Sequence, residues 1–156
     1  RTELINEGQH FTVIVDYAHT PDGVEKVLEF VNDIKKNSVK VVIGCPGDRD
    51  RTKRPVIAKL SVDYADDVIF TTDDPHSEDP VDILNEMTEG IDQQTYEVIV
   101  DRIKAIEAAI NKAKKNDIVL IAVRGHEQLQ YSKSGNIELD DREVAKTILR
   151  KRLNIG

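Results

Sequence analysis

Side chains that can bind charged ligands gather directly after four short apolar runs of the sequence. The segments are D-Y-A-H-T-P-D at 16–22, G-C-P-G-D-R-D-R at 44–51, T-D-D-P-H-S-E-D-P at 72–80 and R-G-H-E at 124–127. Carboxylates accept hydrogen bonds from ammonium groups and hydroxyls, whereas arginines pair with carboxylates and phosphates. The four segments therefore predict binding loops rather than simple connections.

The apolar runs before these segments are expected to be strands, because they are short, rich in Val and Ile and bounded by turn residues. They lie at 11–15, 39–43, 67–71, 96–100 and 118–123. Segments with helical spacing of apolar residues separate them. Runs that are apolar on both faces and alternate with helices predict an α/β, Rossmann-like fold, in which a mainly parallel sheet carries helices on both faces. In such a sheet, ligands bind outside the carboxyl ends of the strands, where the four segments would meet.

Some polar residues in these segments have a purely structural interpretation. Thr20 or Asp22 beside Pro21, and Asp79 before Pro80, are typical of helix starts. Cys45 at a strand end is expected to be a small buried residue without a chemical role. Near the end of the chain, 128–131 and 136–139 flank a polar turn and predict a hairpin, and a capping residue at 140 predicts a final helix.

The bulk composition favours one soluble domain. The chain has 156 residues, a formal net charge of -7 with mixed signs and a single cysteine. The absence of a basic stripe argues against nucleic acid as a partner, and no apolar run is long enough to span a membrane. One cysteine cannot form a disulfide framework, so a cytoplasmic location is expected.

The four motifs resemble those of a known family in their residues and in their order along the chain. F-T-V-I-V-D-Y-A-H-T-P-D at 11–22, G-C-P-G-D-R-D-R-T-K-R-P at 44–55, D-D-P-H-S-E-D-P at 73–80 and R-G-H-E are similar to the C-terminal domain of UDP-N-acetylmuramoyl-tripeptide synthetases, which are Mur ligases. The resemblance extends over essentially the whole chain. It implies an ATP-dependent ligase that adds a third amino acid, lysine or meso-diaminopimelate, to UDP-MurNAc-L-Ala-D-Glu in peptidoglycan synthesis.

The resemblance also implies that this chain is one part of that ligase. The sequence contains no G-x-x-x-x-G-K-[ST] phosphate loop. In that family the loop belongs to a central domain, which would hold most of the ATP and Mg²⁺, and an N-terminal domain would bind the uridine nucleotide of the UDP-MurNAc-dipeptide. Residues 1–156 are expected to form a single C-terminal domain, excised from a three-domain ligase and inactive alone. Neither a catalytic residue nor a metal ligand is expected here.

Binding roles follow from matching the motifs residue by residue. Asp16 and His19 look like the positions that face ATP, where a carboxylate can accept a ribose hydroxyl and a histidine can approach a phosphate. Arg49 resembles the arginine that grips the carboxylate of the free diamino acid through two hydrogen bonds. The alternative for Arg49 is a surface ion pair with Asp48 or Asp50.

The remaining site residues concern the side chain of the incoming amino acid. Asp73, Asp74 and His76 occupy the motif with which the family selects that side chain, and Gly125 with Glu127 resembles the wall that receives its distal amine. Ligases that add meso-diaminopimelate carry D-N-P-R in the 73–76 motif. Asp74 and His76 depart from that pattern and remove a permanent cation, which favours lysine. Pro46 replaces a usual glycine, and we have no functional account of this change.

Two other functions fit the same residues. Aspartates and histidines at strand ends could assemble a two-metal phosphoesterase, although interleaved arginines would oppose the metal charge. A non-catalytic nucleotide-binding module is the other alternative, and it would need no partner domains.

Overall fold

The computed structural model describes residues 2–125 and 127–154, and it is built on one six-stranded sheet. The strands are β1 (Thr2–Ile5), β2 (Thr12–Asp16), β3 (Val39–Ile43), β4 (Asp67–Phe70), β5 (Glu97–Val98) and β6 (Ile118–Ala122). Their order across the sheet is β1-β2-β6-β3-β4-β5, and only β1 runs antiparallel to its neighbour. The expected mainly parallel sheet is confirmed.

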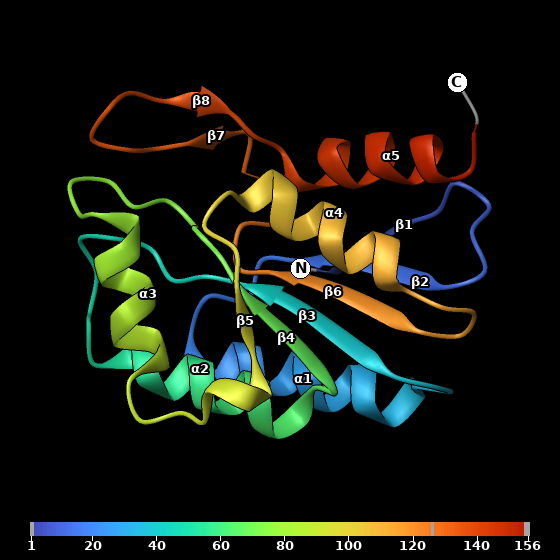
Figure 1. Cartoon of the computed structure of the whole chain (residues 1–156), viewed down its shortest axis with the longest axis horizontal. Coiled ribbons are helices and arrows are strands. Elements are labelled where there is room, and N and C mark those ends of the chain that lie inside the picture. The colour runs from blue at the N-terminus through green and yellow to red at the C-terminus, as the bar shows by residue number, and fades with distance from the viewer. Residues whose placement is uncertain (1, 126, 155–156) are drawn as a thin grey trace.

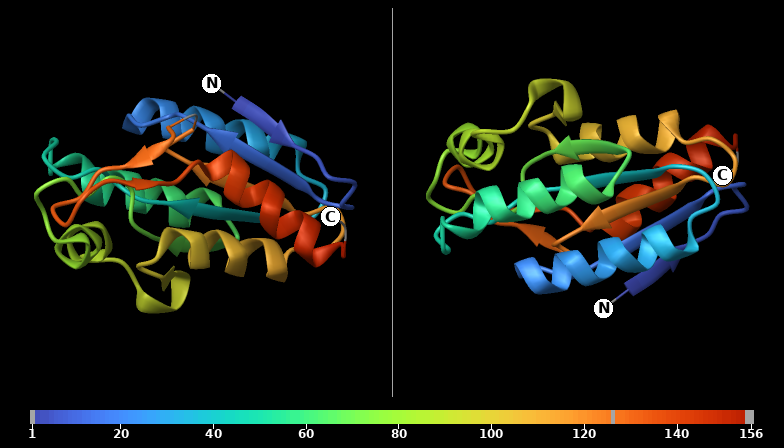
Figure 2. Two further views of the ribbon diagram at one scale, coloured as in Figure 1. Left: turned by 90° about the horizontal axis from the view of Figure 1, so that it is seen from above. Right: turned by 90° about the horizontal axis from the view of Figure 1, so that it is seen from below.

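Helices cover both faces of this sheet, as predicted. They are α1 (Pro21–Ile34), α2 (Lys53–Tyr64), α3 (Pro80–Thr88), α4 (Arg102–Lys112) and α5 (Asp141–Arg152), with a short 3₁₀ turn at Gln93–Thr95. Figure 1 shows α1 and α2 below the sheet and α4 and α5 above it, and the views in Figure 2 confirm the three layers. The predicted hairpin is present as β7 (Leu129–Gln130) and β8 (Ile137–Glu138), beside the carboxyl ends of the strands.

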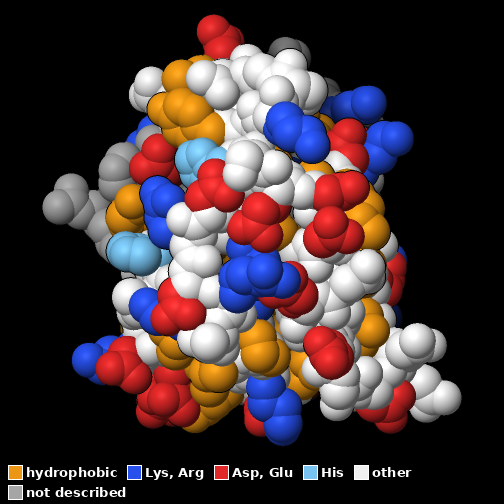
Figure 3. All heavy atoms as spheres, turned by 90° about the vertical axis from the view of Figure 1, so that its left-hand side faces the viewer, with side chains coloured by type: hydrophobic (Ala, Val, Ile, Leu, Met, Phe, Trp, Pro, Cys, Tyr) orange, Lys and Arg blue, Asp and Glu red, His pale blue; other side chains and the backbone are white. Residues whose placement is uncertain are grey.

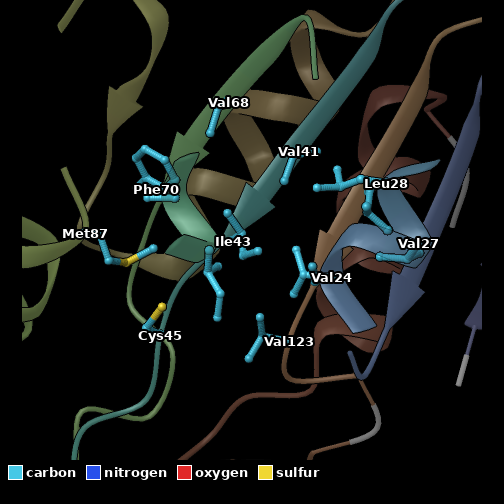
Figure 4. Packing of buried hydrophobic residues seen from close by; sticks show 14 of the residues in the cluster. Val24, Val27, Leu28, Val41, Ile43, Cys45, Val68, Phe70, Met87 and Val123 are labelled. Atoms are coloured by element: carbon cyan, nitrogen blue, oxygen red, sulfur yellow. The ribbon is translucent and has the colours of Figure 1, made fainter. Parts of the chain in front are cut away.

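Two apolar cores, one on each face, explain why the strands are apolar on both sides. Val24 and Leu28 of α1 pack with Ile43, Phe70 and Met87 in the lower core (Figure 4). The upper core joins the opposite faces of the same strands to α4 and α5. Side chains alternate between faces along a strand, so consecutive Val and Ile residues supply both cores.

The predicted structural roles of the helix-start residues are also confirmed. The Thr20 hydroxyl accepts a hydrogen bond from the Gly23 N–H at 3.1 Å and caps α1, so the cap is Thr20 rather than Asp22. The Asp79 carboxylate accepts from Val81 N–H at 2.9 Å and caps α3. Cys45 is buried at the end of β3, and burial raises the pKa of its thiol. A protonated, enclosed thiol is a poor nucleophile.

The edges of the sheet differ from the prediction. The run at 96–100 was expected to form a strand buried on both faces, but only Glu97–Val98 is a strand and both residues are exposed. β1 was not predicted, because three of its four residues are exposed and give no two-sided apolar signal. Edge strands need one paired side only, so composition specifies them weakly.

The strand order explains how distant loops meet. β6 is inserted between β2 and β3, although it follows β5 in the chain. The loop after β6 therefore lies between the loops after β2 and β3, at the same end of the sheet. Among the helices that the structure describes, none is both long and apolar enough to cross a membrane.

Candidate functional site

Six of the eight predicted site residues line one pocket of about 190 Å³ at the carboxyl ends of the strands. These six are His19, Arg49, Asp73, Asp74, His76 and Glu127. The face that carries these loops shows acidic and basic side chains side by side, with histidines among them (Figure 3). The pocket is thus bounded by both signs of charge, which suits a zwitterionic ligand better than a purely anionic one.

Asp16 lies beside this pocket in a second groove, between β1, the loop after β2 and α1. Its carboxylate accepts hydrogen bonds from the Thr2 hydroxyl at 2.6 Å and from the Ala18 N–H at 2.8 Å. His19 lines both the groove and the pocket, and its Nδ1 lies 3.2 Å from the Tyr17 carbonyl oxygen. The two residues predicted to face ATP therefore share one groove, and His19 joins it to the pocket.

The turn after β6 brings Glu127 into the pocket with unusual backbone geometry. Val123 has φ of 90° and Gly125 has φ of 52°, and the Val123 N–H bonds the Asp16 carbonyl oxygen at 3.0 Å. A Cβ atom at Gly125 would collide with Tyr17, so glycine is required there by close packing. A β-branched residue at positive φ is strained, and such strain commonly marks a functional turn.

Gly125 consequently acts behind the pocket, by packing against Tyr17, rather than as part of its lining. The Glu127 N–H closes the turn on the Arg124 carbonyl oxygen at 3.0 Å. His126, which belongs to the R-G-H-E motif, lies outside the described residues.

Asp73 and Asp74 form the floor of the pocket with Arg124. The Arg124 Nε lies 3.3 Å from Asp74 Oδ1 and 3.7 Å from Asp73 Oδ1. Burial raises the pKa of Asp73 to about 7, although the guanidiniums of Arg102 and Arg124 act in the opposite direction. Near neutral pH the floor can therefore hold a proton, a property that the sequence did not indicate.

Two side chains that were not predicted hold this floor in place. Arg102 forms a two-bond pair with Asp141, with both N–O distances at 2.8 Å, and also donates to the Thr72 carbonyl oxygen at 3.0 Å. Arg124 reaches the same Asp141 carboxylate at 3.4 Å. These groups are fully buried, so removing one partner would leave an uncompensated charge.

The loop of Arg49 is tied to the loop of Asp74. The Gly47 N–H donates to the Asp74 carbonyl oxygen at 2.8 Å, and Asp48 accepts from the Ser77 hydroxyl at 2.6 Å. A Cβ atom at Gly47 would collide with the Pro75 carbonyl, so the two loops pack too closely for any side chain there. This contact fixes the distance between the arginine and the pocket floor.

An ion pair between buried Arg54 and partly exposed Glu78 strengthens the same connection. Arg54 donates two hydrogen bonds to Glu78, at 3.0 and 2.7 Å, and one to the Pro46 carbonyl oxygen at 3.1 Å. The hydrogen bonds from Arg54 lower the pKa of Glu78 to about 2. Glu78 is therefore ionised at neutral pH and holds both loops through Arg54.

Arg49 itself remains available to a ligand. Its side chain is exposed, and among the described residues its Nη1 donates only to the adjacent Asp48 carbonyl oxygen at 3.1 Å. Within residues 2–125 and 127–154, no ion pair joins Arg49 to Asp48 or Asp50. The alternative of a surface ion pair is therefore not supported.

The arrangement of carboxylates bears on the metal hydrolase alternative. In the part of the chain that the structure describes, no group of three or more His, Cys, Asp or Glu side chains is placed to hold a metal ion. Asp73 and Asp74 instead face the Arg124 guanidinium, whose charge opposes a bound cation.

Comparison with known proteins decides the family. The model of the family described as "Mur ligase, glutamate ligase domain" matches residues 1–125. The chain belongs to the Mur ligase family. It is 49% identical over 154 residues to the UDP-N-acetylmuramoyl-L-alanyl-D-glutamate–2,6-diaminopimelate ligase of Bacillus cereus, and 52% identical over 154 residues to that of Geobacillus thermodenitrificans.

The Mur ligase relatives are much longer than this chain. The matches cover 99% and 97% of the chain but only 31% and 32% of the two relatives. A solved structure of a protein with the same ligase name superposes with a TM-score of 0.92 at 36% identity, over 98% of this chain and 32% of the other. E. coli FolC in complex with ADP superposes with a TM-score of 0.60 at 19% identity, over 99% and 31%, which shows a shared fold.

Proposed function

We propose that this Mur ligase domain binds the free amino acid that a full-length, ATP-dependent ligase adds to UDP-MurNAc-L-Ala-D-Glu. The observation that carries the proposal is the convergence of an exposed arginine, a glutamate and an aspartate pair, of which Asp73 is buried, on one pocket of about 190 Å³. An amino acid with a second amine offers a carboxylate, an α-amine and a distal ammonium, which are complementary to these groups.

Each pocket side has a defined task in this proposal. Arg49 grips the α-carboxylate with its planar guanidinium, and Glu127 receives the distal ammonium as an anionic partner. Asp73, Asp74 and His76 contact the far end of the side chain and select it. Holding the amino acid at both ends orients its α-amine toward the opening of the pocket, where the acceptor carboxyl group must arrive.

ATP is assigned to the neighbouring groove. The Asp16 carboxylate is a hydrogen-bond acceptor that suits a ribose hydroxyl, while His19 and Lys26 offer donors to phosphate oxygens. These residues fit the edge of a nucleotide, and the sequence holds no phosphate loop to cradle the rest. When bound with ATP, Mg²⁺ neutralises phosphate charge. We assign that site to the region of the ligase outside these 156 residues.

The partners and setting follow from this division. The domain would work with N-terminal and central domains of its own ligase, and the reaction would take place in the cytoplasm. The third amino acid is lysine or meso-diaminopimelate: the names of the two relatives favour the latter, whereas Asp74 and His76 favour lysine.

The test is phosphate release by the full-length ligase with ATP, Mg²⁺ and UDP-MurNAc-L-Ala-D-Glu, supplied with lysine, meso-diaminopimelate, ornithine or no amino acid. Release should require the dipeptide and one of these amino acids. Arg49→Ala should raise the KM for that amino acid by about tenfold or more, because a charge-assisted pair is lost, and leave the KM for ATP unchanged.

Lys53→Ala provides the matched control, since Lys53 is an exposed cation at the start of α2, close in sequence to Arg49. It should leave both KM values unchanged. Release that does not depend on any amino acid would contradict the proposed function.

A further inference from the structure

We infer that Tyr131, which follows β7 in the hairpin, is a specificity-determining residue of the amino-acid pocket. The inference rests on the proposed function and deepens it. Tyr131 lies beyond residues 1–125, the part matched by the family model, so that match gives it no role. Its ring lines the pocket and also holds His76 in position.

Three consecutive hairpin residues each bond to the pocket. The Leu129 carbonyl oxygen accepts a hydrogen bond from Arg124 Nη2 at 2.7 Å. The side-chain amide of Gln130 donates to the Asp73 carbonyl oxygen at 2.7 Å. The Tyr131 N–H lies 3.3 Å from Asp74 Oδ1. The hairpin is therefore attached to the floor of the pocket and is not an independent surface loop.

Tyr131 also contacts His76 through its ring. The His76 and Tyr131 rings stack with centroids 5.7 Å apart and an interplanar angle of 6°. The His76 N–H also donates to the Tyr131 carbonyl oxygen at 2.9 Å, in a backbone conformation with φ of 51°. Left-handed backbone is costly for a non-glycine residue, so His76 keeps it only while neighbouring contacts hold it.

The stacked rings of His76 and Tyr131 form a flat aromatic wall of the pocket. Tyr131 is 36% exposed, so part of its ring can contact a ligand. The aliphatic stem of a diamino acid can pack along such a surface, while its two charged ends reach Arg49 and Glu127. A change in the position of the wall would alter which stem length and which distal group fit.

This role predicts a defined kinetic pattern in the full-length ligase. Tyr131→Ala should raise the KM for the preferred amino acid by about tenfold and reduce the discrimination among lysine, ornithine and meso-diaminopimelate. The KM values for ATP and for UDP-MurNAc-L-Ala-D-Glu should stay unchanged, because neither ligand is assigned to this wall. Tyr131→Phe retains the ring and should behave like the unaltered ligase.

The control is Ile137→Ala, in the partner strand of the same hairpin. Ile137 pairs with Gln130 but is exposed, so its loss perturbs the hairpin without touching the rings. A double variant, His76→Ala with Tyr131→Ala, should raise the KM by less than the product of the two single-variant factors, because the tyrosine acts partly through the histidine. Thermal unfolding of each variant separates loss of folding from loss of the wall.

The outcomes are distinct. An unchanged KM and unchanged amino-acid discrimination in Tyr131→Ala would overturn the inference while leaving the proposed function intact. An equal effect of Tyr131→Ala and Ile137→Ala would also overturn it, because the hairpin would then matter only as a support. Absence of amino-acid-dependent phosphate release in the unaltered ligase would overturn the proposed function and this inference together.

Discussion

At the scale of single residues, the unusual feature of the site is an imbalance of buried charge. Three carboxylates, Asp73, Asp74 and Asp141, lie around two guanidiniums, Arg102 and Arg124. One negative charge is therefore left without a matching cation in a region with little solvent. A buried carboxylate in this position either takes up a proton or attracts a cationic group of a ligand.

Asp73 is the carboxylate with the raised pKa, about 7, and this shift has a consequence for stability. Between about pH 4 and pH 7 the folded chain holds a proton on Asp73 that the unfolded chain has released, so its stability falls as the pH rises through this window. Asp73→Asn cannot titrate. Its stability relative to the unaltered chain should rise by up to about 4 kcal/mol over the same window and stay constant above it.

The measurement is urea unfolding of the two chains at several pH values. Asp82→Asn is a suitable control, because Asp82 is an exposed carboxylate in the first turn of α3. A difference between Asp73→Asn and the unaltered chain that is the same at pH 4 and pH 8 would show that Asp73 is not the group that binds the proton.

At the scale of elements, Asp117 joins the starts of two central strands at the opposite end of the sheet. It precedes β6, and its carboxylate accepts from the Ser38 N–H at 3.2 Å, the Asn37 amide at 2.7 Å and the Lys114 N–H at 2.8 Å. Burial alone would raise the pKa of Asp117, but these hydrogen bonds outweigh it and lower the pKa to about 2.

The sign of this effect is opposite to that of Asp73. The stabilisation by ionised Asp117 is present above the ordinary carboxyl pKa of 3.8 and is lost as the pH falls toward about 2. Asp117→Asn should therefore cost about 2 kcal/mol at pH 7 and progressively less below about pH 4. Denaturant unfolding at pH 7 and pH 3 checks this, and an equal cost at both pH values would contradict it.

Elements with strong local signals could be predicted from the sequence. The central strand Val39–Ile43 has the predicted bounds, because a strand buried on both faces must be continuously apolar. The start of α1 beside Pro21 was predicted with Thr20 or Asp22 as alternatives, and the structure has Thr20 as the cap. At the edges of the sheet, the prediction of a buried strand at 96–100 was wrong and the strand Thr2–Ile5 was not predicted. Both edge strands depend on pairing with a neighbour rather than on their own burial.

The candidate site was predictable to the extent that it depends on parallel-sheet geometry. His19, Arg49 and Glu127 come from separate loops, yet they meet because the strands before them end at one edge. The roles of Arg102, Asp141 and Tyr131 could not be predicted in the same way. Their contacts arise from the docking of α4, α5 and the hairpin against the loops, which no local pattern encodes.

At the scale of the whole molecule, the amino-acid pocket and the Asp16 groove open side by side at one end of the sheet. His19 borders both, so a nucleotide in the groove and an amino acid in the pocket would approach each other there. All of the groups assigned to binding lie at this end, whereas the acceptor dipeptide and the main phosphate contacts have no assigned residues in the chain. Under the proposed function, two substrates would therefore be presented from outside it.

This division predicts the behaviour of residues 1–156 on their own. Two apolar cores lie on the two faces of one sheet and provide a complete interior, so the chain should unfold cooperatively in urea. It should release no phosphate from ATP when supplied with Mg²⁺, UDP-MurNAc-L-Ala-D-Glu and lysine or meso-diaminopimelate. The full-length ligase, assayed in parallel, should be active. Turnover by the 156 residues alone would show that the phosphate and dipeptide sites lie within this domain. Non-cooperative unfolding of residues 1–156 in urea would show that their cores depend on the rest of the ligase.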